Sequence, residues 1–279
     1  MKKFGLIGHP VAHSLSPALF KAAYDGKYAY DLIEGEDFEA SYRRFAEEYD
    51  AINVTAPFKE PAFFKAEILS EECKATGATN LLVKTPEGIK AYNSDFLGVR
   101  MWLSEVAEDM KGVLPPWPQG EGPAKREGFL SYPQLPLKGV KILIVGLGGA
   151  GKAAAAAAES LGMEVIRMNR TIRDGQTRPL SDFRECFREA DIIIYNIPAA
   201  IPEMNELTDS DFTPGRPKHI MEANYRNPSF DENLIKKMKE ANPLAEYTGG
   251  RTWLLYQALT GYEIFTGEKP DLEKMSTVL

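Results

Sequence analysis

The feature that most constrains the fold of this 279-residue chain is a glycine cluster between an apolar run and an alanine-rich stretch. Residues 140–145 are apolar apart from one lysine, and most of them are β-branched, which is typical of a buried strand. Gly146, Gly148 and Gly151 follow with Gly-x-Gly-x-x-Gly spacing, and residues 150–161 predict a helix. A strand, a tight turn and a helix in this order predict the first unit of a parallel sheet.

The glycine spacing also predicts chemistry. The first glycine permits a tight turn, the second lets backbone approach a pyrophosphate, and the third lets the helix pack closely on the strand. The helix N-terminus adds free N–H donors and a partial positive charge. We expect a dinucleotide to bind here, and a tight turn without a ligand is the alternative. The expected cofactor-binding residues are Gly146, Gly148, Gly149, Ala150 and Gly151.

The end of the next strand bears on which dinucleotide binds. An acidic residue about 20 positions beyond the glycines would bind a ribose 2′-hydroxyl and select NAD. Residues 165–168 are followed instead by Asn169-Arg170-Thr171, and a guanidinium there suits a 2′-phosphate, so NADP is favoured. Lys152 and Arg173 would add positive charge, whereas the nearest acid, Asp174, would weaken the preference. For Arg170 alone, a solvated arginine at a strand end is an equal alternative.

The remaining periodicity predicts an α/β protein of two domains. In the N-terminal part, strands alternate with amphipathic helices and then form a hairpin, which indicates a mixed sheet. Buried strands at 191–195 and 219–223 continue a doubly wound, Rossmann-like sheet. The expected domains are a substrate-binding and catalytic domain at 1–110, completed by 248–279 through a returning helix at 253–264, and an NADP-binding domain at 138–247. The stretch 111–136 has six prolines and four glycines, so residues 111–137 are expected to be a linker or insertion.

Composition limits the partners. The net charge of -7 disfavours a nucleic acid or an anionic membrane as the main partner. No segment has the length and apolar character of a signal peptide core or a membrane span. Cys73 and Cys186 match no metal or redox spacing, which fits a reducing compartment. We therefore expect a cytoplasmic protein with a small-molecule substrate, as a monomer or homodimer.

Polar side chains follow several strands of the N-terminal domain, where ligands bind in open α/β sheets. Ser14 and Ser16 present two hydroxyls suited to one carboxylate, although Ser16 before Pro17 is also a good helix cap. Lys59 is a candidate acid or base, and Asp95 is a carboxylate that would pair with it and orient it. The alternative for Lys59 is a solvated surface charge.

The three histidines offer no convincing metal site. His9 and His13 have the spacing of two ligands on a helix, but Pro10 places them in a loop. We expect no bound metal.

Taken together, the motifs resemble those of the shikimate dehydrogenase family, and the resemblance spans nearly the whole chain. In chain order they are His13-Ser14-Leu15-Ser16-Pro17, Asn53-Val54-Thr55-Ala56-Pro57-Phe58-Lys59, Gly77-Ala78-Thr79-Asn80, Asn93-Ser94-Asp95, the glycine cluster, Asn169-Arg170-Thr171, and Gly249-Gly250 with Trp253-Leu254 and Gln257-Ala258. The family reduces 3-dehydroshikimate to shikimate with NADPH, in chorismate and aromatic amino acid biosynthesis.

The resemblance implies roles for individual residues. Lys59 and Asp95 would be the catalytic pair. The substrate would be bound by Ser14 and Ser16 at its carboxylate and by Thr55, Asn80, Asp95 and Gln257 at its ring hydroxyls, with Tyr225 a less secure contact. Further contacts to NADP are implied for Asn169, Arg170, Thr171, Asn196, Pro198 and Gly249.

Some positions depart from the family pattern, and two other functions stay open. The surroundings of Asn196 and Pro198 lack an expected small polar residue and a glycine, Glu222 stands where aspartate is usual, and an extra residue follows Tyr225. One alternative is a quinate/shikimate dehydrogenase that uses NAD. The other is a non-catalytic dinucleotide-binding protein on the same scaffold, against which the presence of both Lys59 and Asp95 argues.

Overall fold

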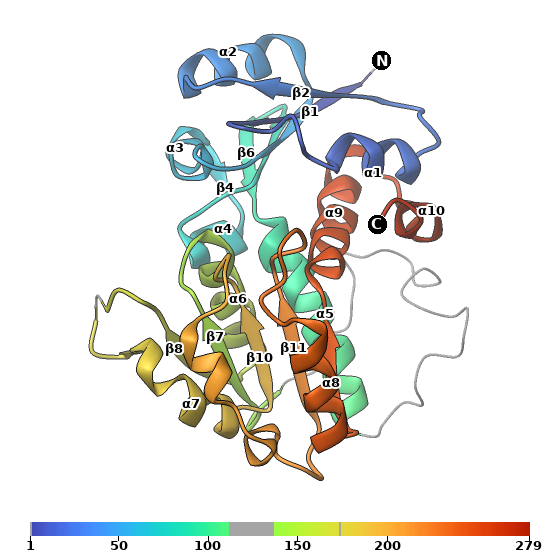
Figure 1. The fold of residues 1–279 in the computed structure, drawn as a ribbon. Coiled ribbons are helices and arrows are strands. Elements are labelled where there is room, and N and C mark those ends of the chain that lie inside the picture. The colour runs from blue at the N-terminus through green and yellow to red at the C-terminus, as the bar shows by residue number, and fades with distance from the viewer. Residues whose placement is uncertain (1, 112–136, 173) are drawn as a thin grey trace. The chain divides into compact units, whose positions relative to one another are not determined.

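The computed structural model describes residues 2–111, 137–172 and 174–279, and among these the chain divides into two compact units. The first unit contains residues 2–101 and 255–279, and the second contains residues 102–111 and 137–254 apart from 173 (Figure 1). Most of the predicted insertion, residues 112–136, lies outside the described residues. At its edges, Lys111 is the last residue of helix α5, and Leu137 is buried.

The first unit is built on a six-stranded mixed sheet with the order β2-β1-β3-β5-β6-β4. Strand β1 is parallel to both of its neighbours, β2 and β3. Strand β5 is antiparallel to both β3 and β6, and β4 is parallel to β6. The strands are β1 (Lys3–Gly8), β2 (Ala29–Glu34), β3 (Ala51–Val54), β4 (Ile68–Leu69), β5 (Leu81–Thr85) and β6 (Gly88–Tyr92).

Helices before, between and after these strands complete the unit. They are α1 (Ser16–Ala23), α2 (Phe38–Glu48), α3 (Lys59–Lys65), α4 (Glu71–Thr76), α5 (Ser94–Lys111), α9 (Gly250–Thr266) and α10 (Leu272–Ser276), and α5 and α9 each extend into both units. One hydrophobic core combines Ile7, Ile52 and Val54 of the sheet with Phe45 of α2 and Ala62 of α3.

The C-terminal part of α9 packs within the first unit. The rings of Phe4 and Phe265 stack with centroids 5.5 Å apart, and Phe20 meets Tyr262 edge-on at 4.8 Å. Buried aromatic pairs of this kind join residues from opposite ends of the chain into one core. The predicted return of the C-terminal helix is confirmed.

The second unit contains a six-stranded sheet with the order β12-β11-β10-β7-β8-β9, in which all pairs are parallel. Read from β9, the order is 3-2-1-4-5-6 in chain sequence, which is that of a Rossmann fold. The strands are β7 (Lys141–Val145), β8 (Glu164–Met168), β9 (Thr177–Arg178), β10 (Ile192–Tyr195), β11 (Lys218–Glu222) and β12 (Ala245–Thr248).

Helices cover both faces of this sheet. Alternate residues Leu143, Ile193 and Tyr195 share a core with Phe183 and Phe187 on one face. Buried alanines of α6 contact the sheet from the other face. The α-helices are α6 (Gly149–Ser160), α7 (Phe183–Glu189) and α8 (Glu232–Ala241), and short 3-10 helices occupy Leu180–Asp182, Pro202–Glu206 and Asp209–Phe212. The predicted two-domain α/β architecture is confirmed.

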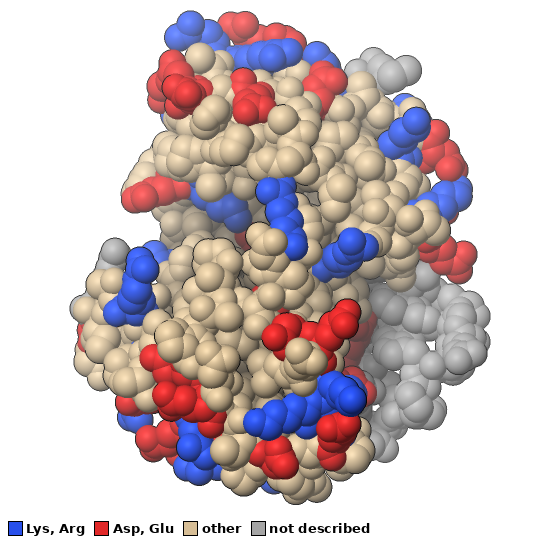
Figure 2. Space-filling view, viewed as in Figure 1, with Lys and Arg blue, Asp and Glu red and all other residues tan. Residues whose placement is uncertain are grey.

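The charged side chains and the two cysteines are distributed as the composition leads one to expect. Lys and Arg side chains alternate with Asp and Glu on the face drawn in Figure 2. Within the described ranges, no helix is long and apolar enough to cross a bilayer. Cys73 and Cys186 are both buried and free, and burial raises the pKa of the Cys73 thiol to about 11. In the same ranges, no group of three metal-binding side chains occurs.

Candidate active site and dinucleotide site

In the first unit, four polar loops meet at one edge of the sheet. The register pairs Asn53 with Leu81 and Leu81 with Tyr92, so the end of β3, the start of β5 and the end of β6 lie side by side. The loop after β1 joins them because His9 N donates to Ala56 O at 3.1 Å. Since β3 and β5 are antiparallel, residues before β5 share this edge with residues after β3. The strand pairing therefore gathers Thr55, Asn80 and Asp95.

An ion pair lies at this edge. Lys59 Nζ donates to Asp95 Oδ2 at 2.6 Å. The Asp95 side chain is only 8% exposed, whereas that of Lys59 is 29% exposed. The carboxylate is therefore largely withdrawn from water, and the ammonium keeps an open side toward a ligand. The predicted pairing of these two residues is present in the structure.

Asp95 owes its position to the start of helix α5. Asn93 Oδ1 accepts the Phe96 backbone N–H at 3.1 Å, while its amide donates to Thr76 Oγ1 and Ala78 O, both at 3.1 Å. The side chain thus caps the helix and ties it to the preceding loop. Asp95 follows in the first helical turn, where the partial positive charge of the helix end favours a carboxylate.

A buried amide network adjoins the ion pair. Asn80 Oδ1 accepts Ser94 N at 2.7 Å, and Asn80 Nδ2 donates to Ser94 Oγ at 3.0 Å and to Gln257 Oε1 at 3.4 Å. Helix α9 comes this close because Gly98 of α5 lacks a side chain: a Cβ there would lie 2.7 Å from Gln257 N. Asn80 and Gln257, predicted as substrate contacts, are thus brought together beside Asp95.

The serine pair forms a small polar group at the start of α1. Ser14 Oγ donates to Ser16 Oγ at 3.1 Å and accepts Ser16 N at 3.2 Å. The expectation that Ser16 caps this helix is wrong, because α1 begins at Ser16 and the residue before it, Leu15, provides no side-chain cap. Pro17, expected at the first helical position, is the second residue of the helix. Ser16 is held instead through its carbonyl, which accepts Tyr262 OH at 3.1 Å.

In the second unit, the glycine turn has the predicted geometry. Gly146 has φ +88°, which favours glycine. A Cβ on Gly151 would lie 1.8 Å from Gly146 O, so α6 packs directly on the turn. At Gly148 a Cβ would meet nothing within 4 Å among the described residues, because its backbone faces open space. The three positions match the three roles that the spacing predicts.

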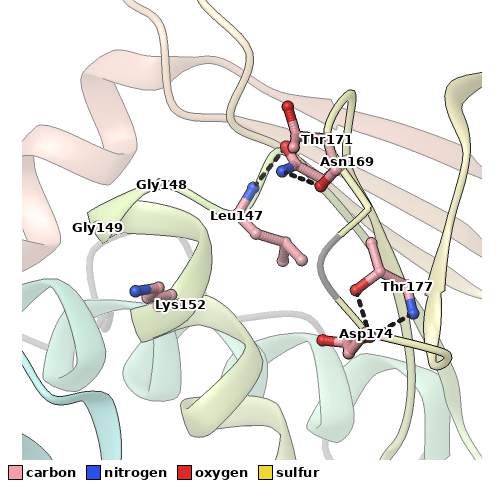
Figure 3. Close-up of a pocket in the computed structure, with 8 residues that line it drawn as sticks. All are labelled: Leu147, Gly148, Gly149, Lys152, Asn169, Thr171, Asp174 and Thr177. Carbon is pink, nitrogen blue, oxygen red and sulfur yellow. Dashed lines mark hydrogen bonds between the residues drawn. The ribbon is translucent and has the colours of Figure 1, made fainter.

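Two cavities adjoin at this turn, with volumes of about 500 and 490 Å³. Leu147, Gly148 and Asn169 border both, so together they form one elongated site. The first cavity is also bordered by Gly149, Lys152, Thr171, Asp174 and Thr177 (Figure 3), and the second by Gly146, Arg170, Leu180, Asn196, Pro198 and neighbours of Pro198. A site divided in this way suits a ligand with two ends joined by a pyrophosphate.

Asn169 connects the glycine turn to the loop after β8. Its Oδ1 accepts Leu147 N at 3.4 Å, and its Nδ2 donates to Thr171 O at 3.0 Å (Figure 3). Asn169 therefore positions the backbone on both sides of the first cavity.

An unsatisfied acceptor marks the second cavity. Asn196 Oδ1 is buried and has no hydrogen-bond partner within the described parts of the chain, while its Nδ2 donates to Val145 O and Ile194 O at 3.4 Å. A buried acceptor without a donor destabilises a protein unless a ligand or water completes it. A hydroxyl or amide of a bound dinucleotide would supply the donor. The glycine turn, the cavities and this acceptor together fit a dinucleotide.

The remaining predicted residues are placed as follows. Gly149, which borders the first cavity, is the first residue of α6, and Ala150 is in the first turn of that helix. Gly249 falls between β12 and α9, and neither cavity described above includes it. Tyr225 follows β11 in the second unit, whereas the other predicted substrate contacts belong to the first unit.

The structure adds residues that the sequence did not single out. Thr177 borders the first cavity and donates through its hydroxyl to Asp174 Oδ1 at 2.8 Å. Leu180 and Ile201 supply apolar wall to the second cavity. These residues reach the cavities only through the path of the loops in the folded chain, and no local sequence motif predicts that path.

The strand order, the glycine turn and the two cavities are typical of the dinucleotide-binding domain of a dehydrogenase. The first unit contains the ion pair between Lys59 and Asp95. Residues 6–82 match the family model described as shikimate dehydrogenase substrate binding domain. Residues 119–221 match the model described as D-isomer specific 2-hydroxyacid dehydrogenase, NAD binding domain. With the relatives below, these matches show that the chain is similar to shikimate dehydrogenases along nearly its whole length.

Curated relatives and solved structures agree. A shikimate dehydrogenase (NADP(+)) of Carboxydothermus hydrogenoformans is 26% identical over 100% of this chain and 96% of its own length. One from Caldanaerobacter subterraneus is 28% identical over 96% of this chain and 92% of its own. The crystal structure of shikimate 5-dehydrogenase from Thermus thermophilus in complex with shikimate is 25% identical, with TM-score 0.72, and the match covers 100% of this chain and 97% of that one.

Proposed function

We propose that this chain is an NADP-dependent shikimate dehydrogenase, which interconverts 3-dehydroshikimate and shikimate. The ion pair between Lys59 and Asp95 carries the proposal, because a dinucleotide-binding protein without a reaction needs no such pair beside an amide network. The similarity of the chain to shikimate dehydrogenases that use NADP supports it. The reaction would serve chorismate and aromatic amino acid biosynthesis.

The reduction needs a proton at the oxygen of the 3-keto group. NADPH supplies the hydride when it is bound. Lys59 donates a proton to the developing alkoxide and stabilises its negative charge, and in the reverse direction its neutral amine accepts the hydroxyl proton. Asp95 holds the ammonium at 2.6 Å and accepts from a neighbouring ring hydroxyl. The positive charge of Lys59 is therefore in place before the oxygen of the keto group becomes anionic.

The remaining polar groups fix the substrate. Ser14 and Ser16 donate to its carboxylate, and Thr55, Asn80 and Gln257 contact its ring hydroxyls. These contacts suit a small polyhydroxylated acid, and they restrict the direction from which the keto group meets Lys59. In the second unit, the glycine turn and Asn169 would hold the pyrophosphate, and the Asn196 oxygen would accept from a donor of the dinucleotide. Tyr225 would be a further substrate contact and Gly249 a further contact to NADP, although neither residue borders the two cavities.

The test is an absorbance assay of NADP reduction with shikimate as the reductant. Turnover with shikimate and NADP is the expected result. Quinate with NAD is the comparison, because quinate differs at the carbon that bears the carboxylate. Faster turnover with quinate and NAD would replace the proposal by the quinate alternative, and no turnover with either pair would favour a non-catalytic dinucleotide-binding protein.

We further propose a cytoplasmic location and an assembly no larger than a homodimer. The two buried free thiols support a reducing compartment. Light scattering on the purified chain distinguishes a monomer from a homodimer.

A further inference from the structure

The first cavity is bordered by a carboxylate, which would disfavour the binding of a 2′-phosphate there. Asp174 borders this cavity together with Gly148 and Gly149 of the phosphate-binding turn. In Rossmann domains, an acidic residue beyond the second strand binds the ribose 2′-hydroxyl, and it repels a phosphate there. Asp174 is the acid after the second strand of this sheet, β8.

The carboxylate is held firmly by its own turn. Asp174 Oδ1 accepts Gln176 N at 2.9 Å, Thr177 N at 2.8 Å and Thr177 Oγ1 at 2.8 Å. These donors lower its pKa below the ordinary value, so the group is ionised at neutral pH. Figure 3 shows its other oxygen directed away from Thr177, toward the side of the cavity where Leu147 and Lys152 lie.

Two cationic side chains counteract the negative charge of Asp174. Lys152 borders the same cavity, and Arg170 borders the adjoining one. A 2′-phosphate would gain from Lys152 and Arg170 and lose from Asp174, whereas a 2′-hydroxyl would gain a hydrogen bond to Asp174. The site therefore combines features that select each of the two nucleotides.

We propose that Asp174 is a specificity-determining residue that lowers the preference for a 2′-phosphate, so that the chain binds NAD as well as NADP. The inference rests on the dinucleotide site of the proposed function. It adds the nucleotide class that the site accepts and the residue that controls the choice.

Binding of two half-ligands tests this directly, without turnover. Calorimetry gives the Kd of adenosine 2′,5′-bisphosphate and of 5′-AMP for the parent, for Asp174→Asn and for Glu240→Gln. The asparagine keeps an oxygen for the Thr177 donors and removes the charge. Glu240 is an exposed acid on α8, outside both cavities, so Glu240→Gln controls for the change in net charge.

We expect Asp174→Asn to shift the Kd ratio toward the bisphosphate by about tenfold or more, because a like charge next to the phosphate is gone. Glu240→Gln should leave the ratio unchanged. A ratio within about twofold of the parent in Asp174→Asn would overturn the inference. Thermal unfolding of each variant excludes loss of the fold as the cause, and Asp174→Ser, which keeps a turn acceptor, serves as the second charge-free variant.

The outcomes separate the two proposals. If the ratio does not move while shikimate still reduces NADP, only the role of Asp174 is overturned. If neither nucleotide binds to the parent, the dinucleotide site is wrong and this inference is wrong with it. If the ratio moves and shikimate does not reduce NADP, the role of Asp174 is supported and the proposed reaction is contradicted.

Discussion

Lys59 and Asp95 meet at 2.6 Å although 36 residues separate them and each stands at the start of a different helix. Lys59 is the first residue of α3, and Asp95 lies in the first turn of α5. A carboxylate is favoured at a helix N-terminus, but an ammonium is not. Lys59 gains nothing from its own helix end and is held there by Asp95, which indicates that the pair serves a ligand.

Replacing Lys59 by alanine tests its role in proton transfer. We expect kcat to fall roughly 10²–10⁴-fold, the range for loss of a general acid, while the Kd of shikimate changes much less. Stopped-flow and steady-state assays give kcat, and calorimetry gives the Kd. Lys65→Ala is the matched control, because Lys65 ends the same helix and pairs on the surface with Glu39. An unchanged kcat in Lys59→Ala would remove this residue from the mechanism.

The Asp95→Asn variant tests whether the carboxylate acts through Lys59. Asparagine keeps the size and a hydrogen-bond acceptor but removes the charge that holds the ammonium. We expect kcat to fall at least about tenfold, and the double variant with Lys59→Ala to lose less than the product of the two single losses, since residues acting as a unit are not additive. Fully additive losses in kcat would mean that Asp95 acts only through its contact to a ring hydroxyl and not through Lys59.

Much of this site was predictable because its residues follow strands. Ser14, Thr55 and Asp95 each come shortly after a predicted strand, and ligands bind at such ends. The sequence could not show that Asn80, which precedes a strand, shares their edge, because that depends on β5 running antiparallel to β3. Nor could it show that Ser16 begins its helix rather than capping it, since a cap and a first residue differ by one position.

The glycine turn offers a matched pair of variants. Gly151→Ala would place a Cβ 1.8 Å from the Gly146 carbonyl, so the helix or the turn must move. We expect a fall in unfolding free energy of about 1–3 kcal/mol, as in other overpacked sites. At Gly148 nothing described lies within 4 Å of a Cβ, so Gly148→Ala should keep its stability and instead weaken NADP binding.

Urea unfolding and NADP titration of both variants distinguish an effect on the stability of the fold from an effect on ligand binding. If Gly148→Ala binds NADP as the parent does, no pyrophosphate approaches that backbone. If Gly151→Ala is as stable as the parent, α6 does not pack this closely on the turn in solution.

The dinucleotide half shows where sequence reasoning ends. The glycine spacing and the apolar strands predicted the turn and the parallel sheet, because both are local patterns. The unsatisfied Asn196 oxygen and the turn that fixes Asp174 depend on which backbone groups come within reach after folding. The short strands β9 and β12 complete the sheet with two and four residues, too few for a periodic signal.

A buried lysine in the second unit predicts a pH-dependent stability. Lys218 is fully buried on β11, where its Nζ donates to Phe187 O at 2.7 Å and to Ala190 O at 2.5 Å. Burial lowers its pKa from 10.5 to about 8. Between these two pH values, the unfolded chain keeps a proton that the folded chain has released, so the free energy of unfolding rises with pH.

Lys218→Met removes this titration while keeping an apolar chain of similar length. We expect the parent to gain up to about 3 kcal/mol relative to the variant between about pH 7 and about pH 10, from the shift in pKa. Urea unfolding at several pH values measures both free energies. The variant leaves two carbonyls without a donor, which changes its stability at every pH, so the change with pH is the quantity to compare. Parallel profiles for the two proteins would show that Lys218 does not release its proton in this range.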